Sequence, residues 1–220
     1  MIPSNVTASG LALIQAWEGL GDGNPKTVLL EPYLCSAGVA TVGWGHAILD
    51  DTGQQIRVGR TLTRSAALER ARIQMRQRYG RDGISHTQAQ ALFAADITPR
   101  VRAVRAAIDA GRLPTTPCEL DAMVSLAFNI GTAAFEKSTV CRLHVRGLRV
   151  AKDVALDIPT LVQRSQSKAA PATLATAFVA WSWAGGKWSL GLFRRRMCEL
   201  MVYRGQPLDE ALAIAQAIKV

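Results

Sequence analysis

The first stretch of alternating apolar and polar positions runs from residue 8 to residue 18. Leu13, Trp17 and Leu20 recur there at helical spacing, which predicts an amphipathic helix. The stretch ends at Glu18 and glycines follow it, so we expect this glutamate at a helix end that faces a loop. A glutamate in such a place is most often a solvated helix terminus. Beside an aromatic, half-dry surface it can instead serve as a general acid.

The pattern changes between residues 26 and 58, where glycine and proline separate short β-rich runs. This punctuation predicts a small antiparallel sheet with tight turns. The run 41–46 predicts one strand whose alternate residues face opposite sides. Thr41 is expected on the side of a cleft and His46 on the other side.

From residue 61 onward the pattern is helical. Residues 63–79 predict a long basic helix, and a capping box at 85–88 opens the next one, which we expect Pro99 to disturb. A second capping box at 116–119 opens the most apolar segment of the chain. Its apolar residues repeat at helical spacing, which predicts the core helix of a helical lobe.

These elements predict an α+β fold within a single domain, 1–220. We expect a small lobe over about 19–60, a connecting helix over about 63–79 and a helical lobe over about 84–220. A cleft between two lobes is the usual place for a binding or catalytic site.

Composition narrows the class of partner. Apolar residues make up 49% of the 220 residues, which is typical of a packed globule. Lys and Arg number 26 against 17 Asp and Glu, so the net charge is +9. This balance favours a polyanionic partner such as nucleic acid, an anionic membrane surface or an acidic cell wall. No nucleic-acid-binding fingerprint accompanies the charge, so we expect no specific nucleic-acid partner.

The four cysteines are widely spaced, without a CxxC pair or clustered histidines, so we expect no metal site. The apolar run at 11–17 is too short for a secretory signal or a transmembrane segment. We therefore expect a protein made in a cytoplasm with its thiols reduced.

Six short motifs, in order along the chain, resemble the phage-type lysozymes, the muramidase endolysins of tailed bacteriophages. They are Trp17-Glu18-Gly19-Leu20, Thr41-Val42-Gly43-Trp44-Gly45-His46, Ala91-Leu92-Phe93-Ala94-Ala95-Asp96, Ala127-Phe128-Asn129-Ile130-Gly131, Ala184-Gly185-Gly186-Lys187 and Gly191-Leu192-Phe193-Arg194-Arg195-Arg196.

The resemblance implies a lysozyme-like fold and hydrolysis of the β-1,4 bond between N-acetylmuramic acid and N-acetylglucosamine in peptidoglycan. It also implies a catalytic triad in which Glu18 is the acid, Cys35 the middle residue and Thr41 the last, six residues later. Glycoside cleavage needs an acid for the leaving oxygen and a group that delivers water. Because a neutral thiol is a poor base, Thr41 would do most of the positioning of the water. Without the resemblance, Cys35 reads as a small buried residue at the start of a hairpin.

Two departures from the family stand out. Glu18 and Cys35 lie 17 residues apart, a longer interval than in the family, so the segment at about 21–30 must loop out. Otherwise Asp22 or Glu31 takes the middle role, although Glu31 is expected to face solvent in a turn. A second insertion lies at about 148–172 and could be an extra hairpin or helix over the cleft.

The resemblance implies roles for four further residues. It pairs His46 with Asp96 across the junction of the lobes, as a structural ion pair. Phe128 and Ser138 match substrate-lining positions, although a core or capping role suits them equally well. The tryptophans between 181 and 188 could stack on sugars but are more often core residues, and the arginines 194–196 are expected on a solvated helix face.

The resulting hypothesis is a monomeric muramidase without a cofactor that acts on peptidoglycan. It would wait in the host cytoplasm and reach the periplasmic cell wall through a holin. Three alternatives stay open at this point: a wall-binding or virion structural protein that has lost activity, a nucleic-acid-binding protein, and a transglycosylase that makes anhydro-sugar ends.

Overall fold

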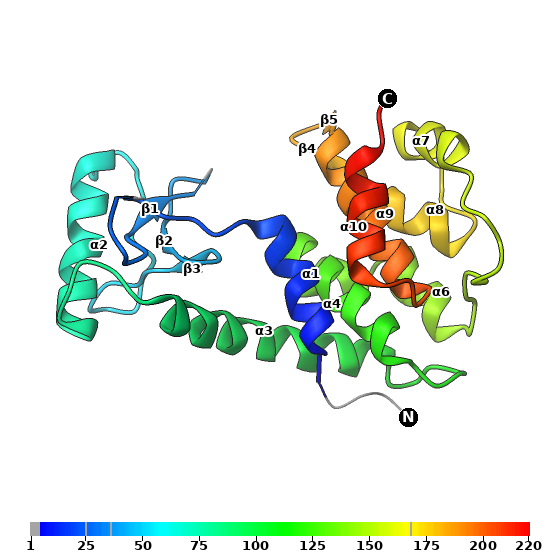
Figure 1. Ribbon diagram of the computed structural model, residues 1–220, viewed down its shortest axis with the longest axis horizontal. Coiled ribbons are helices and arrows are strands. Elements are labelled where there is room, and N and C mark those ends of the chain that lie inside the picture. The colour runs from blue at the N-terminus through cyan, green and yellow to red at the C-terminus, as the bar shows by residue number, and fades with distance from the viewer. Residues whose placement is uncertain (1–4, 25, 36, 168) are drawn as a thin grey trace. The chain divides into compact units, whose positions relative to one another are not determined.

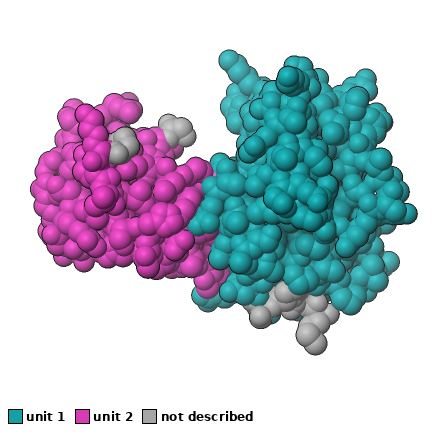
Figure 2. Space-filling view, in the orientation of Figure 1, with its two compact units in different colours: residues 1–17, 99–220 teal, residues 18–98 magenta. Residues whose placement is uncertain are grey.

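The computed structural model describes residues 5–24, 26–35, 37–167 and 169–220. The chain divides into two compact units, one of residues 18–98 and one of residues 1–17 and 99–220 (Figure 2). Many helices accompany two small antiparallel sheets, which confirms the predicted α+β class (Figure 1). Among the helices of the described residues, none is long and apolar enough to span a membrane. The four cysteines are free thiols.

The unit 18–98 is built on a three-stranded antiparallel sheet in the order β1-β2-β3. Its elements are β1 (Tyr33–Leu34), β2 (Ala40–Val42), β3 (His46–Ala47), α2 (Arg64–Tyr79) and the first part of α3 (His86–Ile108). Thr63 caps α2 by accepting from the backbone N–H of Ala66. At the other end Gly80 adopts a left-handed φ of 71°, which a residue with a Cβ adopts only with strain.

The prediction of one strand over 41–46 is wrong. The chain reverses there, and Val42 in β2 pairs with His46 in β3. Gly43 and Gly45 have φ of 61° and 81°. Because glycine reaches positive φ without a Cβ penalty, these two residues turn a run that reads as a strand into a hairpin.

The two compact units divide the chain at other positions than the predicted lobes. The helix expected to connect the lobes does form, as α2, but it packs against β1 and β2 inside the unit 18–98. Two of its four buried residues, Ala67 and Ala71, are small and allow close packing. The division between the units falls instead within α3, between Thr98 and Pro99. Pro99 does not end that helix, which continues to Ile108.

The second unit is mainly helical. Its elements are α1 (Ala8–Glu18, of which Glu18 is counted with the first unit), α4 (Pro117–Ile130), α5 (Thr132–Glu136), α6 (Thr139–Val145), α7 (Ile158–Gln166), α8 (Leu174–Val179), β4 (Trp183–Ala184), β5 (Lys187–Trp188), α9 (Leu190–Tyr203) and α10 (Leu208–Ala217). The predicted capping box opens α4, with Thr116 and Glu119 bonding each other's backbone N–H groups. Every residue from Glu119 to Ala127 is buried. The helix α4 packs against α9, and α9 also packs against α10.

The arginines on α9 correct another expectation. Arg195 and Arg196 are 4% and 0% exposed, so they do not lie on a solvated face. The fully buried carboxylate of Glu199 accepts from Arg195 Nε at 3.1 Å and Arg196 Nη2 at 2.9 Å, and also from Ser125 Oγ of α4 at 2.7 Å. Burial of the cations is tolerable because they meet an opposite charge and hydrogen-bonding partners.

The insertion at 148–172 contains the helix α7, one of the two forms that the sequence left open. Asp157 caps it by accepting from the Thr160 N–H at 3.2 Å. The segment before α7 is held by Arg204, which donates to the carbonyl oxygens of Ala151 at 3.0 Å and Lys152 at 2.7 Å. Lys168, near the end of the insertion, lies outside the described residues.

Candidate active site

Glu18 is the last residue of α1, and its side chain is exposed. Gly19 follows it with φ 69°, a conformation that ends the helix. At its start the helix is fixed by Asp121 of α4, which accepts from the Thr7 N–H at 2.9 Å and the Thr7 hydroxyl at 2.5 Å. A Cβ on Gly10 would come within 2.4 Å of the Asp121 carboxyl group, so glycine is needed there. The helix end is therefore as expected.

The loop after Glu18 returns to the sheet. The Gly21 N–H donates to the Gly43 carbonyl at 3.1 Å, two residues beyond Thr41 in the chain. The Tyr33 hydroxyl donates to the same carbonyl at 3.3 Å. A Cβ on Gly21 would lie 2.1 Å from the Tyr33 ring, so this ring packs directly on the backbone of the loop. Tyr33 thus joins β1, the loop after Glu18 and the hairpin that follows β2.

Thr41 lies in the middle strand of the sheet, opposite Tyr33 on one side and Ala47 on the other. It is 4% exposed, and its hydroxyl donates to the Tyr33 carbonyl at 3.4 Å. The Thr41 hydroxyl is therefore covered and has a partner within the sheet. A long bond of this kind is weak and can be exchanged for a bond to water.

Cys35 directly follows β1 and opens the turn to β2. Its N–H donates to the Val39 carbonyl at 3.0 Å, and its carbonyl accepts from the Gly38 N–H at 2.9 Å. The pairing of Tyr33 with Thr41 and of Leu34 with Ala40 puts Cys35 diagonally across from Thr41, on the same face. The Cys35 side chain is half-buried.

Asp22 and Glu31 form hydrogen bonds within the inserted loop that separates Glu18 from Cys35. Asp22 Oδ1 accepts from the N–H groups of Asn24 at 2.9 Å and Glu31 at 3.0 Å. The Glu31 carboxylate accepts from Asn24 Nδ2 at 3.1 Å and lies 3.7 Å from Arg72 Nε. Glu31 is 9% exposed, so the expectation that it faces solvent is wrong. Both carboxylates order the loop, whose Pro25 lies outside the described residues.

His46 and Asp96 form the expected contact, with His46 Nδ1 2.9 Å from Asp96 Oδ2 and 3.2 Å from Oδ1. Both residues belong to the unit 18–98, so the pair links β3 to the first part of α3 and does not join two lobes. Trp44 strengthens this link, because its ring lies against those of His86 and Phe93, with centroids 5.1 and 5.6 Å apart.

Phe128 and Ser138 lie in the other unit. The guanidinium of Arg100 stacks over the Phe128 ring, 4.5 Å from its centroid. Ser138 is 4% exposed and caps α6, where its hydroxyl accepts from the Cys141 N–H at 3.1 Å. The structure thus gives Ser138 a capping role, one of the two that the sequence allowed. Among the described residues, no three His, Cys, Asp or Glu side chains gather as metal ligands would.

The model of the phage lysozyme family matches residues 24–158, more than half of the chain. The chain belongs to the phage lysozyme family. The match includes Cys35 and Thr41 but begins after Glu18, so the assignment of the acid rests on the motif around that residue and on its position at the end of α1.

Some of the similar proteins match nearly the whole chain. The SAR-endolysin of Escherichia phage Mu is 28% identical over 95% of this chain and 96% of its own. The endolysin of Acyrthosiphon pisum secondary endosymbiont phage 1 is 28% identical over 63% and 68%. Among solved structures, the endolysin from Escherichia coli O157:H7 phage FAHEc1 has a TM-score of 0.56 and 28% identity over 90% of this chain and 92% of its own. A P22 lysozyme mutant, 23% identical over 91% and 99% with a TM-score of 0.54, shares the fold.

Sequence reasoning assigned no role to Tyr33, which packs on the loop after Glu18, or to Asp121, which holds the start of α1. A signal for Tyr33 exists, because an aromatic residue near a glycine-rich loop can cover a glycine on a neighbouring strand. Asp121 carries no such signal. It lies in the apolar run of α4, and only the fold brings Thr7 to it. Burial raises the pKa of the Asp121 carboxyl, while its bonds from Thr7 act in the opposite direction.

Proposed function

We propose that this lysozyme is an endolysin that hydrolyses the β-1,4 glycosidic bond between N-acetylmuramic acid and N-acetylglucosamine in bacterial peptidoglycan. Membership of the phage lysozyme family supports lysis of peptidoglycan by a glycosidase. We further propose which glycosidic bond is cleaved and which residues act on it. In it Glu18 is the general acid, and Thr41 with Cys35 positions the water.

One observation carries the assignment of residues. The bond from the Gly21 N–H to the Gly43 carbonyl ties the loop after Glu18 to the hairpin after Thr41. Gly21 lies three residues after Glu18, and Gly43 lies two residues after Thr41. The register of the strands β1 and β2 places Cys35 on the same face as Thr41. An acid and a water-positioning group held on one short scaffold are the two components that glycoside hydrolysis requires.

In the proposed reaction, the Glu18 carboxyl group donates its proton to the glycosidic oxygen as the bond to the anomeric carbon breaks. A water molecule held by the Thr41 hydroxyl supplies its oxygen to that carbon. The water's spare proton returns to Glu18 over the full cycle, so one water is consumed for each bond broken. The half-buried Cys35 thiol is a weak hydrogen-bonding partner for this water, which leaves the positioning mainly to Thr41.

Phe128 and Ser138 are proposed to contribute to substrate binding, with Ser138 acting through the start of α6 that it caps. The pair of His46 and Asp96 is proposed to be structural. The protein would act as a monomer without specific binding to nucleic acid, and light scattering after gel filtration tests the first of these points.

The decisive experiment replaces Glu18 with Gln and digests purified peptidoglycan. We expect turnover to fall at least about a hundredfold, since the proton donor is lost. Glu136 also ends a short helix with an exposed side chain, so Glu136→Gln is a matched control that should keep full activity. Mass spectrometry of the wild-type digest should show reducing muramic ends. Anhydro ends would assign the protein to the transglycosylases.

A wall-binding or virion protein without activity is the second candidate, and the buried Thr41 hydroxyl is the observation that favours it. Binding to cell walls with no released ends from the wild-type protein would establish this candidate. For delivery we propose passage from the host cytoplasm to the periplasmic wall through a holin. Expression with and without a holin tests it, and lysis in both cases would refute the holin requirement.

A further inference from the structure

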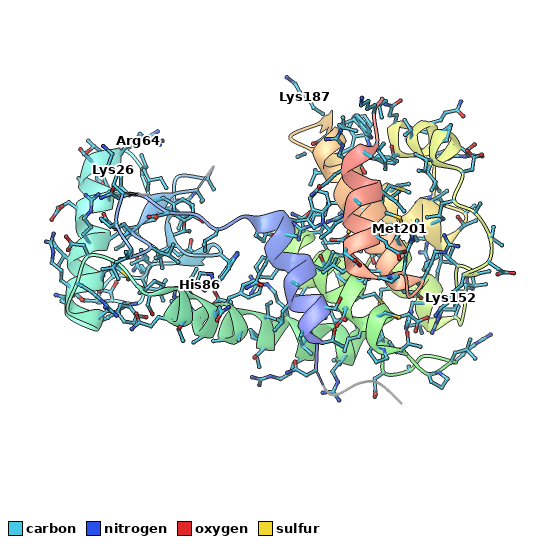
Figure 3. All side chains as sticks on the ribbon, viewed as in Figure 1. Lys26, Arg64, His86, Lys152, Lys187 and Met201 are labelled. Atoms are coloured by element: carbon cyan, nitrogen blue, oxygen red, sulfur yellow. The ribbon has the colours of Figure 1, made fainter. Side chains whose placement is uncertain are left out.

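The hairpin β4–β5 presents an exposed aromatic side chain at the surface of the helical unit. Trp183 pairs with Trp188 and Ala184 with Lys187 across the two strands. Gly185 and Gly186 form the turn with φ of 55° and 76°, the backbone that a tight two-residue hairpin requires. Trp183 is 38% exposed, and every residue of the tip from Ala184 to Lys187 is exposed. Lys187 projects at this tip (Figure 3).

Both indole N–H groups donate hydrogen bonds to one residue of the insertion, Ser165. Trp183 Nε1 donates to the Ser165 carbonyl at 2.8 Å, and Trp188 Nε1 donates to the Ser165 hydroxyl at 2.9 Å. Ser165 is 0% exposed and lies in α7. Trp188 also packs on the buried ring of Phe193, with centroids 5.9 Å apart. The polar edge of Trp183 is therefore satisfied inside the unit, so the part of the indole that is exposed has a fixed orientation.

The surrounding sequence is free of acidic residues. No Asp or Glu occurs between residues 158 and 198, where six Lys and Arg residues lie. Arg195 and Arg196 are buried against Glu199, and Arg194 donates to the Ile218 carbonyl at 2.6 and 3.0 Å. The exposed cations that the structure describes in this stretch are thus Arg164 and Lys187. The hairpin offers an aromatic face and a positive charge to a partner.

We propose that the β4–β5 hairpin is a binding surface for the glycan strand of peptidoglycan. The exposed indole of Trp183 stacks on the apolar face of a sugar ring, and Lys187 pairs with a carboxylate of the wall. The inference rests on the proposed function for its choice of polymer. It also gives the insertion a role, since α7 supplies the residue that fixes both tryptophans.

The chemistry of the surface favours a glycan over other anionic partners. Duplex DNA presents mainly phosphates to a non-specific partner and is bound through many Lys and Arg contacts, whereas the hairpin supplies one exposed lysine. A membrane surface is bound by a broad apolar face with several large side chains, and this hairpin exposes a single indole. A sugar ring needs one aromatic face and a few polar contacts.

The test measures sedimentation with purified peptidoglycan in the Glu18→Gln background, so that the wall stays intact. Trp183→Ala should raise the dissociation constant about two- to tenfold, the usual worth of an aromatic contact. Trp183→Phe keeps a ring and should stay within about twofold of the parent. Ile214→Ala is the matched control, because Ile214 is 39% exposed on α10 of the same unit. Equal losses for Phe and Ala, or no loss for Ala, would overturn stacking by Trp183.

Charge is tested with Lys187→Ala against Lys219→Ala, an exposed lysine of the same unit. The first change should weaken wall binding at low salt, and the difference should shrink as salt screens the charge. Should Trp183→Ala not fold, the intact Glu18→Gln protein still decides the matter. Its Trp183 indole N–H resonance should shift on titration with a soluble glycan tetramer, and an unmoved resonance would refute the proposal.

These measurements do not depend on the proposed reaction. If Glu18→Gln abolishes the release of reducing ends while Trp183→Ala leaves wall binding unchanged, the function stands and the surface fails. If the wild-type protein releases no ends but binds walls through Trp183, the function fails and the surface stands. Binding of duplex DNA through Trp183, with no wall binding, overturns the choice of a glycan.

Discussion

His144 makes the stability of the helical unit sensitive to acid. Its ring is 0% exposed, with Nδ1 2.6 Å from the Tyr203 hydroxyl and Nε2 2.9 Å from the Thr115 hydroxyl. The guanidinium of Arg149 also lies 3.4 Å from Nε2. Burial, with the positive charge of Arg149 as a second cause, lowers the pKa of His144 from 6.5 to about 3. The ring is therefore neutral in the folded protein at neutral pH.

The sign of the pH effect follows from this lowered pKa. Below pH 6.5 the unfolded chain binds a proton at His144 that the folded chain does not bind. The free energy of unfolding therefore decreases as the pH is lowered. The slope is about 1.4 kcal/mol per pH unit and ends near the folded pKa. At about pH 4.5, roughly two units below the unfolded value, the loss amounts to about 2 to 3 kcal/mol.

The assay is denaturant unfolding of the wild type and of His144→Gln between about pH 7 and pH 4.5. The variant is less stable at neutral pH because the ring's packing is lost, but its stability should fall less with acid. Other groups titrate equally in both proteins. Asp50, Asp82 and Asp157 have lowered pKa values and contribute losses mainly below their usual value of 3.8. The same pH dependence in both proteins would refute the buried neutral histidine.

Four further expectations concern single contacts. Cys35→Asp should fold and keep or raise the rate of peptidoglycan hydrolysis, because a carboxylate is a stronger hydrogen-bond acceptor for the water than a neutral thiol. Full activity of Cys35→Ala with none for Cys35→Asp would mean that the thiol only packs. Tyr33→Phe removes one bond to the Gly43 carbonyl and should lower kcat several-fold at an unchanged KM, whereas a change in KM alone would speak against positioning. A double-mutant cycle with Asn at His46 and Asp96, monitored by unfolding, should give a coupling of about 0.2 to 1 kcal/mol, as expected for a partly exposed pair, and a coupling of zero would contradict the contact. Glu199→Ala should cost about 3 to 5 kcal/mol of unfolding free energy, because two buried guanidinium groups lose their anion, and a loss below about 1 kcal/mol would contradict that account.

The parts of the molecule that local interactions decide could be predicted from the sequence. The helix over 63–79 was expected and forms as Arg64–Tyr79, because its cap and its helix-favouring residues act within a few positions. The capping boxes at 85–88 and 116–119 form as well, each from a side chain and a backbone N–H three residues apart. The α+β class followed from these elements and from the glycine-rich segment between them.

The predictions from the sequence were wrong where contacts with residues distant in the chain, or the backbone conformation of a glycine, determine the environment of a residue. Glu31 reads as a solvated turn residue, but the folded loop places Asn24 and Arg72 around its carboxylate. Arg195 and Arg196 read as a solvated face because nothing nearby in the sequence shows that α4 covers them, and Ser125 of that helix reaches Glu199. The run 41–46 reads as a strand because alternation cannot show whether a glycine will adopt a positive φ.

For the candidate active site, the sequence by itself determined the residue types and their order, with Glu18 at a helix end and Cys35 and Thr41 around a hairpin. Side chains and spacing carry that information directly. The tertiary structure alone decided that Tyr33 packs on Gly21, that Asp121 holds the start of α1 and that Ser165 fixes two tryptophans. Each of these contacts joins segments far apart in the chain. Their free energy depends on the burial and geometry that the complete fold creates, which no local pattern contains.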